Sequence, residues 1–386
     1  MYVYLSDTNS RMNSVEKVYG YKLAAWYRRH SLALHVGTMS FGLGYFMTAG
    51  APNNLWSISL GSAVLGYYVG YKPRSNFTTK DLIVISGCNC GLGYSLALHC
   101  RAQGATVLAG VHNLLQNQNA AVVEEFKKKD ILFCDLEITD EESVYAFAQT
   151  VEELIKKKHL VLRALVNNAG VMVFGEFEWQ TSQLMEYQID VNVLGTMRLT
   201  RAMMPMIRQN GSRIIIVSSH CAQEPLPGIS VYGASKAAEY AWATSLRVEL
   251  GKYGVKVVCF IPGGFVSESN IMKRQKKHFQ EMKTYMSEEA NQFYSNYFTK
   301  YAEYLSHVSP NSNELKIITN SRIYETFNDA LLEIYPSEFY RCESWRYFFY
   351  RILFKITPMR MRDWLVMRFV NMPAWQPASK TEKVNK

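Results

Sequence analysis

The chain has 386 residues, of which 48% are hydrophobic and 19% are charged, and its formal net charge is +9. This length allows two or three domains, although single α/β domains often exceed the usual domain size. No Arg-rich tract or zinc-ligand spacing accompanies the positive charge, which argues against nucleic acid as a partner and favours a membrane surface. The seven cysteines do not form paired metal-ligand motifs, so we expect reduced thiols in a cytosol-facing domain and no bound metal.

The first part of the chain contains two uncharged hydrophobic runs. We expect residues 1–31 to form a cytosolic N-terminal segment and residues 32–71 to form a membrane hairpin, with runs at 32–50 and 55–71 joined by an Ala-Pro-Asn-Asn turn. Each run approaches the roughly 17–25 residues that cross a hydrocarbon core. Basic residues flank the hairpin on both sides, which predicts that both of its ends are cytosolic. A shallow hairpin, or a pair of buried or interfacial helices, is the alternative.

The N-terminal segment also bears on localisation. Asp7 and Glu16 fit neither a cleaved signal peptide nor a mitochondrial transit peptide. We therefore expect a protein of the endoplasmic reticulum membrane whose catalytic domain faces the cytosol, with a mitochondrial membrane as the less favoured alternative.

From Asp81 onward, short β-rich runs alternate with longer helical patterns. The predicted strands are Leu82–Ile85, Thr106–Ala109, Ile131–Cys134, Ala164–Asn167, Arg213–Val217 and Val255–Ile261. One of the helices between them is predicted to begin with a capping box at Thr139-Asp140-Glu141-Glu142. Strands joined by helical crossovers predict an α/β protein with a single Rossmann-type, doubly wound parallel sheet, which binds ligands beyond the carboxyl ends of its strands.

A glycine-rich loop follows the first predicted strand. It reads Ser86-Gly87-Cys88-Asn89-Cys90-Gly91-Leu92-Gly93, and a helical pattern comes next. Glycines permit a tight turn, allow the backbone to approach a pyrophosphate and let the helix pack on the strand, while the helix N-terminus favours the anion. Three glycines alone are weak evidence, but their position between strand and helix predicts a dinucleotide site.

The residues after the second strand indicate which nicotinamide cofactor binds. A 2′-phosphate would need Arg or Lys near the end of that strand, yet between Arg101 and Lys127 the sole basic candidate is His112. This favours NAD over NADP. The acidic residue that would bind the ribose hydroxyls is also missing around Gly110-Val111-His112.

Several further motifs occur in order between residues 81 and about 267, and together they resemble the short-chain dehydrogenase/reductase family. The glycine loop matches the family's Thr-Gly-x-x-x-Gly-x-Gly with Ser86 in place of Thr. The other matching elements are Asp135, Asn167-Asn168-Ala169-Gly170, Asn192, Ser219, Tyr232 with Lys236, and Pro262-Gly263-Gly264-Phe265-Val266-Ser267. Within the family, the sequence is most similar to the retinol and hydroxysteroid dehydrogenase branch, including its membrane-bound 11β- and 17β-hydroxysteroid enzymes of type 2. Arthropod relatives in ecdysteroid synthesis are a further group that fits.

The resemblance implies a catalytic tetrad of Asn192, Ser219, Tyr232 and Lys236. Tyr232 and Lys236 lie four residues apart and share one helix face, so an ammonium beside the phenol is expected to lower the phenol's pKa. Tyr232 would then exchange a proton with the substrate oxygen, and Ser219 would donate a hydrogen bond to that oxygen. Lys236 would also hold the nicotinamide ribose, and Asn192 a proton-relay water. Ser219 and Tyr232 are therefore the predicted substrate contacts.

The resemblance also assigns the cofactor contacts. These are Ser86, Gly87, Asn89, Gly91, Leu92, Gly93, Val111, His112, Asp135, Leu136, Asn168, Ala169, Gly170, Tyr232, Lys236, Pro262, Gly263, Phe265 and Ser267. Besides Ser86, both Asn89 and Ser267 depart from the branch's pattern, since they replace an Asp and a Thr. Together with an unusual Glu-Pro-Leu-Pro loop at 224–227, these departures leave the mechanism intact but put the substrate in doubt.

The substrate is expected to be a lipophilic alcohol or ketone, a hydroxysteroid first and a retinoid as the alternative. No charged clamp demands a small acid, so a hydroxybutyrate-like substrate is less favoured. A catalytically inactive, cofactor-binding membrane protein is the alternative of a different class. Membrane lipid and a second copy of the chain, in a homodimer, are the other expected partners.

The dehydrogenase domain is expected to span residues 79–342, with an α-helical substrate lid at 266–312. Aromatic and Met side chains recur there at helical spacing, and some are expected to line an apolar pocket while most pack as ordinary core. Residues 343–386 are expected to form a basic and aromatic helix over 345–369, followed by a tail. Such a helix fits a membrane surface, and a dimer or core contact is the alternative.

Overall fold

The computed structural model describes residues 72–114, 119–264, 268–308 and 315–376, together with isolated helical positions between 34 and 65. The chain divides into two units, Met1–Ser75 with Glu333–Tyr335, and Asn76–Leu332 with Pro336–Lys386. In the first unit, Arg74 forms an antiparallel bridge with Glu333, and Lys72 Nζ lies 3.7 Å from a Glu333 carboxylate oxygen. The hairpin predicted over 32–71 falls almost wholly outside the described residues, and among the described ones no helix is long and apolar enough to cross a membrane.

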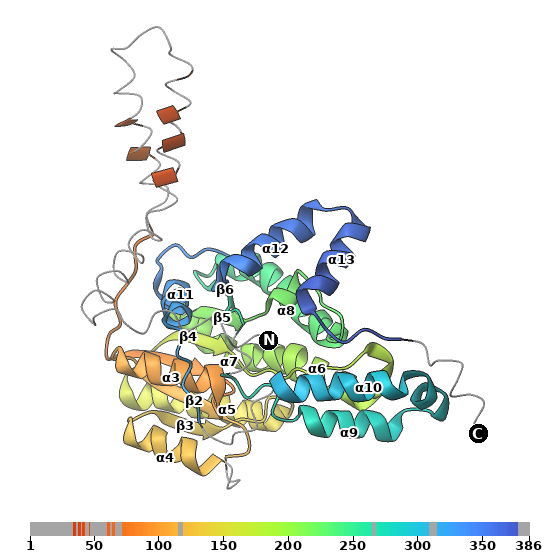
Figure 1. The fold of residues 1–386 in the computed structure, drawn as a ribbon. Coiled ribbons are helices and arrows are strands. Elements are labelled where there is room, and N and C mark those ends of the chain that lie inside the picture. The colour runs from red at the N-terminus through yellow and green to blue at the C-terminus, as the bar shows by residue number, and fades with distance from the viewer. Residues whose placement is uncertain are drawn as a thin grey trace, which may run out of the picture. The chain divides into compact units, whose positions relative to one another are not determined.

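The second unit is built on a parallel sheet of seven strands in the order β3-β2-β1-β4-β5-β6-β7 (Figure 1). The strands are β1 Asp81–Ile85, β2 Thr106–Val111, β3 Leu132–Asp135, β4 Val161–Asn167, β5 Arg213–Val217, β6 Lys256–Ile261 and β7 Phe339–Arg341. The strand order reverses between β1 and β4, which is where open α/β sheets bind their ligands. The predicted parallel sheet and its six predicted strands are confirmed, whereas β7 was not predicted.

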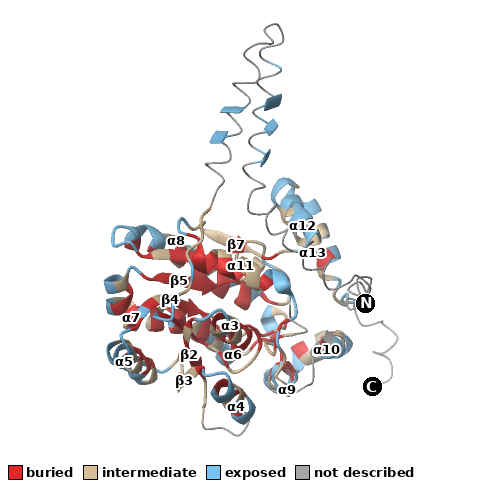
Figure 2. Cartoon of the chain, turned by 90° about the vertical axis from the view of Figure 1, so that its left-hand side faces the viewer, coloured by how far each residue is buried: buried red, intermediate tan, exposed pale blue. Residues whose placement is uncertain are grey.

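Helices cover both faces of this sheet, which confirms the doubly wound arrangement. They are α3 Gly91–Ala102, α4 Ala120–Lys128, α5 Glu141–Lys158, α6 Ser182–Ile189, α7 Thr196–Asn210, α8 Ser230–Gly251 and α11 Ser321–Leu332. The buried side chains form one core with α3, α4 and α11 and another with α5, α7 and α8. Strands buried on both faces explain why β1 and β5 are hydrophobic after their first residue. Figure 2 shows the buried residues gathered at the strands in the middle of the unit.

The start of α5 differs from the predicted capping box. The N-cap is Asp140, whose side chain accepts hydrogen bonds from the backbone N–H groups of Glu142 and Ser143. Thr139 instead donates its hydroxyl to Glu137 at 2.6 Å. The prediction was wrong by one residue because a carboxylate at the following position is an equally good cap and was not weighed.

The second unit also contains two helices, α9 Gln275–Tyr285 and α10 Glu288–Val308, and a short 3₁₀ helix, η2 Phe177–Trp179. The backbone of α10 is kinked at Ser295. Both helices pack on a third apolar cluster, which also contains the predicted catalytic residue Tyr232.

The C-terminal region forms two helices, α12 Trp345–Ile356 and α13 Met359–Val370, where the sequence analysis predicted one. Thr357 and Pro358 between them are extended, because proline cannot continue a helix and disfavours helical geometry in the residue before it. No residue of α12 is buried, and Figure 2 shows both helices largely exposed. Trp345 is 76% exposed and Ile356 is 71% exposed, so this helical pair presents apolar side chains to its surroundings.

Candidate active site

The glycine loop forms the turn between β1 and α3. Gly87 and Gly91 have φ angles of +70° and +59°, a region that favours glycine. A side chain at Gly87 would place its Cβ 2.7 Å from the Ala169 backbone, and one at Gly93 would overlap the Gly87 carbonyl. Neither position admits a methyl group, because the loop packs closely on the segment after β4 and on its own backbone.

The residues after β4 hold this loop in place. The Ser86 hydroxyl accepts hydrogen bonds from the backbone N–H groups of Asn168 and Ala169, each at 3.1 Å. The Asn168 amide donates to the carbonyls of Ser86 at 2.9 Å and Gly87 at 3.0 Å. The two predicted motifs therefore meet at the β1–β4 switch point and act as one rigid unit.

The first turn of α3 is suited to an anion. Its N-cap, Cys90, makes no side-chain capping bond, and no acidic residue lies in the first turn. The N–H groups at the start of a helix attract phosphate when no side chain satisfies them. These features of the helix start fit the pyrophosphate of a dinucleotide.

The end of β2 carries a polar network around His112. Asn89 accepts a hydrogen bond from the His112 N–H at 2.9 Å and donates to the His112 carbonyl at 2.7 Å. The His112 ring pairs with Glu137, with 2.5 Å between Nε2 and Oε2. Glu137 follows β3, so the sequence analysis missed it as a neighbour of β2. Its carboxylate also accepts hydrogen bonds from the Thr139 hydroxyl at 2.6 Å and the Thr139 N–H at 3.1 Å.

The remaining predicted contacts on this side surround the same strand ends. Val111 and Leu136 are buried, and Leu136 lies so close to Gly110 that a Cβ there would meet it at 2.6 Å. The Asp135 carboxylate accepts a hydrogen bond from the Leu114 N–H at 2.8 Å. This bond fixes the loop after β2 at the edge where an adenosine would lie.

Asn192 lies in a short π-helix, η3 Asp190–Gly195, between α6 and α7. Such one-turn π segments often mark functional sites. Its side chain is fully buried, accepts from the Val171 N–H at 2.8 Å and donates to the Val171 carbonyl and the Ser235 hydroxyl, both at 2.9 Å. Asn192 thereby ties the segment after β4 to helix α8.

Ser219, Tyr232 and Lys236 meet at the carboxyl end of β5. Ser219 caps a short 3₁₀ helix, η4 His220–Ala222, by accepting the Cys221 N–H at 3.2 Å, and it is hydrogen-bonded to the Tyr232 phenol. Lys236, on α8 with Tyr232, donates to the Val217 carbonyl at 3.1 Å. Its ammonium lies 6.0 Å from the centroid of the Tyr232 ring. The spacing seen in the sequence therefore brings a hydroxyl, a phenol and an ammonium together.

The electrostatics differ from the expectation of a lowered phenol pKa. Burial raises the pKa of Tyr232 above its usual value, with further rises from Cys221 and Glu239 and a partial offset from the Ser219 hydrogen bond. The Lys236 ammonium is paired with the Glu239 carboxylate at 2.8 Å. An ammonium neutralised in this way stabilises a phenolate less than an unpaired one. Glu239 belongs to no motif that the sequence analysis used.

The segment after β6 closes the site. Gly263 has a φ of +85°, and a side chain there would overlap the Cys342 carbonyl just after β7. Pro262 precedes it, while the predicted contacts Phe265 and Ser267 lie outside the described residues. A Cβ at Gly264 would sit 3.4 Å from the Tyr347 hydroxyl, so α12 borders this end of the site.

The described lid residues pack tightly beside Tyr232. Trp179 is the centre, with four aromatic rings from α10 around it: Tyr294, Tyr297, Phe298 and Tyr301. Phe279 and Met282 of α9 belong to the same cluster. Most of the aromatic and Met positions in the predicted lid that the structure describes are therefore core, in one apolar cluster with Tyr232.

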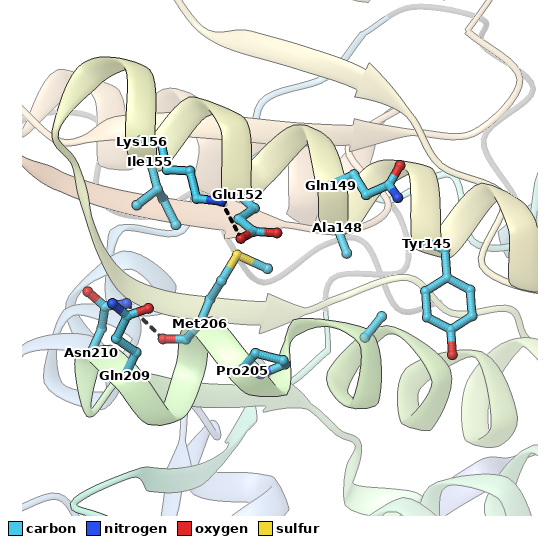
Figure 3. Close-up of a pocket in the computed structure, with 11 residues that line it drawn as sticks. Tyr145, Ala148, Gln149, Glu152, Ile155, Lys156, Pro205, Met206, Gln209 and Asn210 are labelled. Carbon is cyan, nitrogen blue, oxygen red and sulfur yellow. Dashed lines mark hydrogen bonds and ion pairs between the residues drawn. The ribbon is translucent and has the colours of Figure 1, made fainter.

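A separate hollow of about 300 Å³ lies between α5 and α7 (Figure 3). Its lining residues are Tyr145, Ala148, Gln149, Glu152, Ile155, Lys156, Ala202, Pro205, Met206, Gln209 and Asn210. Since neither Tyr232 nor Lys236 lines it, this hollow is not the catalytic site. Within the described ranges, no group of His, Cys, Asp and Glu side chains could hold a metal ion.

The sequence profile of the short chain dehydrogenase family matches residues 81–278, just over half of the chain. The chain belongs to the short-chain dehydrogenase family. The matched span runs from β1 into α9 and so contains the glycine loop and the tetrad.

Curated relatives of this short-chain dehydrogenase differ in the substrates that their names state. Mitochondrial D-beta-hydroxybutyrate dehydrogenase of Rattus norvegicus is 29% identical over 53% of this chain and 60% of its own length. Retinol dehydrogenase 7 of Rattus norvegicus is 30% identical over 69% of this chain and 82% of its own length. Estradiol 17-beta-dehydrogenase 2 of Rattus norvegicus is 26% identical over 75% of each chain. The chain thus spans about 60% of the hydroxybutyrate dehydrogenase that it matches.

Among solved structures, a short-chain dehydrogenase from Streptomyces avermitilis is 29% identical. The match has a TM-score of 0.43 and covers 48% of this chain and 67% of that chain.

Proposed function

We propose that this short-chain dehydrogenase is an NAD-dependent oxidoreductase that moves a hydride between the nicotinamide and a lipophilic alcohol or ketone, most readily a hydroxysteroid. The observation that carries the proposal is the meeting of Ser219, Tyr232 and Lys236 at the carboxyl end of β5, in a fold whose glycine-rich turn joins β1 to the uncapped start of α3. The roles given to these residues follow from their chemistry and position.

Each residue of the tetrad has a separate role in proton transfer. In alcohol oxidation, Ser219 donates a hydrogen bond to the reacting oxygen while Tyr232 accepts its proton, and in carbonyl reduction Tyr232 donates a proton to it. Lys236 holds positive charge near the phenol, and Asn192 fixes the segment after β4 against α8. Bound nicotinamide would supply or accept the hydride.

The cofactor preference rests on the end of β2. The Glu137 carboxylate there pairs with His112 at 2.5 Å. A 2′-phosphate needs an Arg or Lys near the end of this strand, and none occurs between Arg101 and Lys127, while Glu137 adds negative charge there. NAD is therefore favoured over NADP, with the contacts along Ser86–Gly93, Asn168–Gly170 and Pro262–Gly263.

The substrate preference rests on the apolar cluster that includes Tyr232, formed largely by α9, α10 and η2. The arginines near the Ser219 loop are already engaged, since Arg341 donates to Gln223 at 2.8 Å and Arg351 to Glu343 at 2.6 Å. A steroid fits such surroundings better than a short hydroxy acid. Retinol is the second candidate, supported by the length over which retinol dehydrogenase 7 matches.

The first experiment supplies the purified full chain with NAD or NADP and, in turn, estradiol, all-trans-retinol and D-3-hydroxybutyrate. We expect NAD-dependent oxidation of one lipophilic alcohol and a loss of about 10²–10⁴-fold in the variant Tyr232→Phe. Tyr253→Phe is the matched control, because Tyr253 is half-exposed just beyond α8. Turnover of D-3-hydroxybutyrate alone would reject the lipophilic substrate. Cofactor binding without any turnover would favour an inactive cofactor-binding protein.

Membrane attachment is proposed through two segments, the hairpin 32–71 and the α12–α13 pair. The apolar side chains of α12 and α13 are interleaved with Arg and Lys, a pattern suited to the surface of an anionic bilayer. We expect the chain to sediment with endoplasmic reticulum membranes, its catalytic domain open to protease from the cytosolic side. Sedimentation with mitochondria would instead support attachment to a mitochondrial membrane. A homodimer is proposed as well, and light scattering of the detergent-solubilised chain tests it.

A further inference from the structure

A buried carboxylate lies beside the predicted catalytic lysine. Glu239 is three residues after Lys236 on α8, with 2.8 Å between Lys236 Nζ and Glu239 Oε2. The side chains are 6% and 2% exposed. An ion pair this deep is costly to desolvate, and removing either partner would leave a buried, uncompensated charge.

Among the described residues, Lys236 is the cation that acts on Glu239. The ionisable neighbours of Glu239 are Lys236 and Tyr232, which lie one and two turns before it on α8, and the Cys259 thiol on β6. Burial raises the pKa of Glu239 to about 7, and Lys236 opposes this rise. On the other side of the site, η4 brings Cys221 toward both Tyr232 and Lys236. Glu338 reaches the same region from β7's side, where it interacts with Cys259.

The position of the ammonium follows from these contacts. Lys236 is held by Glu239 on one side and by the Val217 carbonyl at 3.1 Å on the other, while the Tyr232 ring centroid is 6.0 Å away. A positive and a negative charge this close act on the phenol as a dipole, whose field is weaker than that of the ammonium alone.

We propose that Glu239 is a positioning residue for the tetrad, an internal counter-ion that holds the Lys236 ammonium in place and weakens its electrostatic support of the Tyr232 phenolate. The inference rests on the proposed function of Tyr232 and Lys236. The Glu239 carboxylate is expected to touch neither substrate nor cofactor and to act through Lys236. When Glu239 carries its charge, a more alkaline solution is needed before Tyr232 can accept a proton.

The test is the pH profile of alcohol oxidation by the full chain, with NAD and estradiol as the first probe. In Glu239→Gln, the pH at which kcat is half-maximal is expected to fall by about one unit or more, as expected for removing a unit charge several ångströms from the phenol. Glu239→Asp keeps the charge and should restore most of the wild-type profile. Glu249→Gln is the matched control, because it neutralises an exposed carboxylate on the same helix. A lower kcat with an unmoved midpoint would show a merely structural role and overturn the inference.

A double-mutant cycle, measured by thermal unfolding, tests the Lys236–Glu239 pair even if Glu239→Gln folds poorly or estradiol is not turned over. Measured at alkaline pH, Lys236→Met should lower the melting temperature, because Glu239 must then either stay charged without its partner or take up a proton, and Lys236→Met/Glu239→Gln should recover most of that loss. A double variant no more stable than Lys236→Met would mean that the two charges are not coupled, and the inference would be wrong. Failure of the proposed function is seen separately, as undiminished activity in Tyr232→Phe.

Discussion

Replacing Trp179 by alanine should release helix α10 from the body of the enzyme. The indole is 2% exposed and touches four rings, with centroid distances of 5.4 Å to Tyr294, 5.5 Å to Tyr297, 4.9 Å to Phe298 and 5.1 Å to Tyr301. Burying about 150–250 Å² of an aromatic side chain at about 25 cal/mol per Å² stabilises by about 4–6 kcal/mol. The indole N–H has no hydrogen-bond partner, so its removal returns about 1 kcal/mol. The net loss is therefore about 4 kcal/mol, within the range for Trp→Ala substitutions in cores.

Amide hydrogen exchange measures which helices and strands are destabilised in Trp179→Ala. Because α10 packs on Trp179, its amides should exchange up to about a thousandfold faster in Trp179→Ala, while those of β1 and β5 change less. The matched control is Phe177→Ala, since Phe177 lies in the same 3₁₀ helix but is 65% exposed. Wild-type exchange in α10, or an equal effect from Phe177→Ala, would refute the view that Trp179 anchors the lid.

Three further predictions test other parts of the structure. Burial lowers the pKa of His278 to about 4. The neutral ring therefore stabilises the fold fully above pH 6.5, and about 2 kcal/mol of this stability, after solvent screening, is lost as the pH falls toward 4. In thermal unfolding scans across this pH range, His278→Gln should lose less stability than the wild type. Gly93→Ala should weaken NADH binding at least about tenfold in fluorescence titrations, because its methyl group overlaps the glycine loop. Gly251→Ala is the control and should bind NADH as the wild type does, because a Cβ there meets no atom within 4 Å. Asp140→Ala should cost about 1 kcal/mol in denaturant unfolding through the lost N-cap, and Glu142→Gln should change far less.

Much of the fold could be predicted because its strands are buried on both sides. Runs such as Arg213–Val217 are hydrophobic at nearly every position, and the helical stretches between them allow a parallel sheet. The glycine loop and Tyr232 with Lys236 could be found because their spacing is local in the sequence. Their meeting with Ser219 then follows from the order of the strands.

Other features depend on contacts that no local pattern reveals. Strand β7 is three residues long and is a strand because β6 lies beside it. Glu137 and Glu239 look like ordinary charged residues until the fold places one beside His112 and buries the other beside Lys236. The break between α12 and α13, in contrast, was visible as Pro358 and was not used in the prediction.

The late position of β7 in the chain affects how the sheet folds during synthesis. β7 pairs with β6 in parallel, at Cys259–Phe339 through Ile261–Arg341, and α9, α10 and α11 all lie between the two strands in the sequence. A pairing over such a distance pays a large loop-closure entropy and forms slowly. During synthesis, β6 is therefore an open edge until residue 341 has left the ribosome, and an open edge invites pairing with another chain. A nascent chain stalled between these strands should be the species that chaperones bind most strongly.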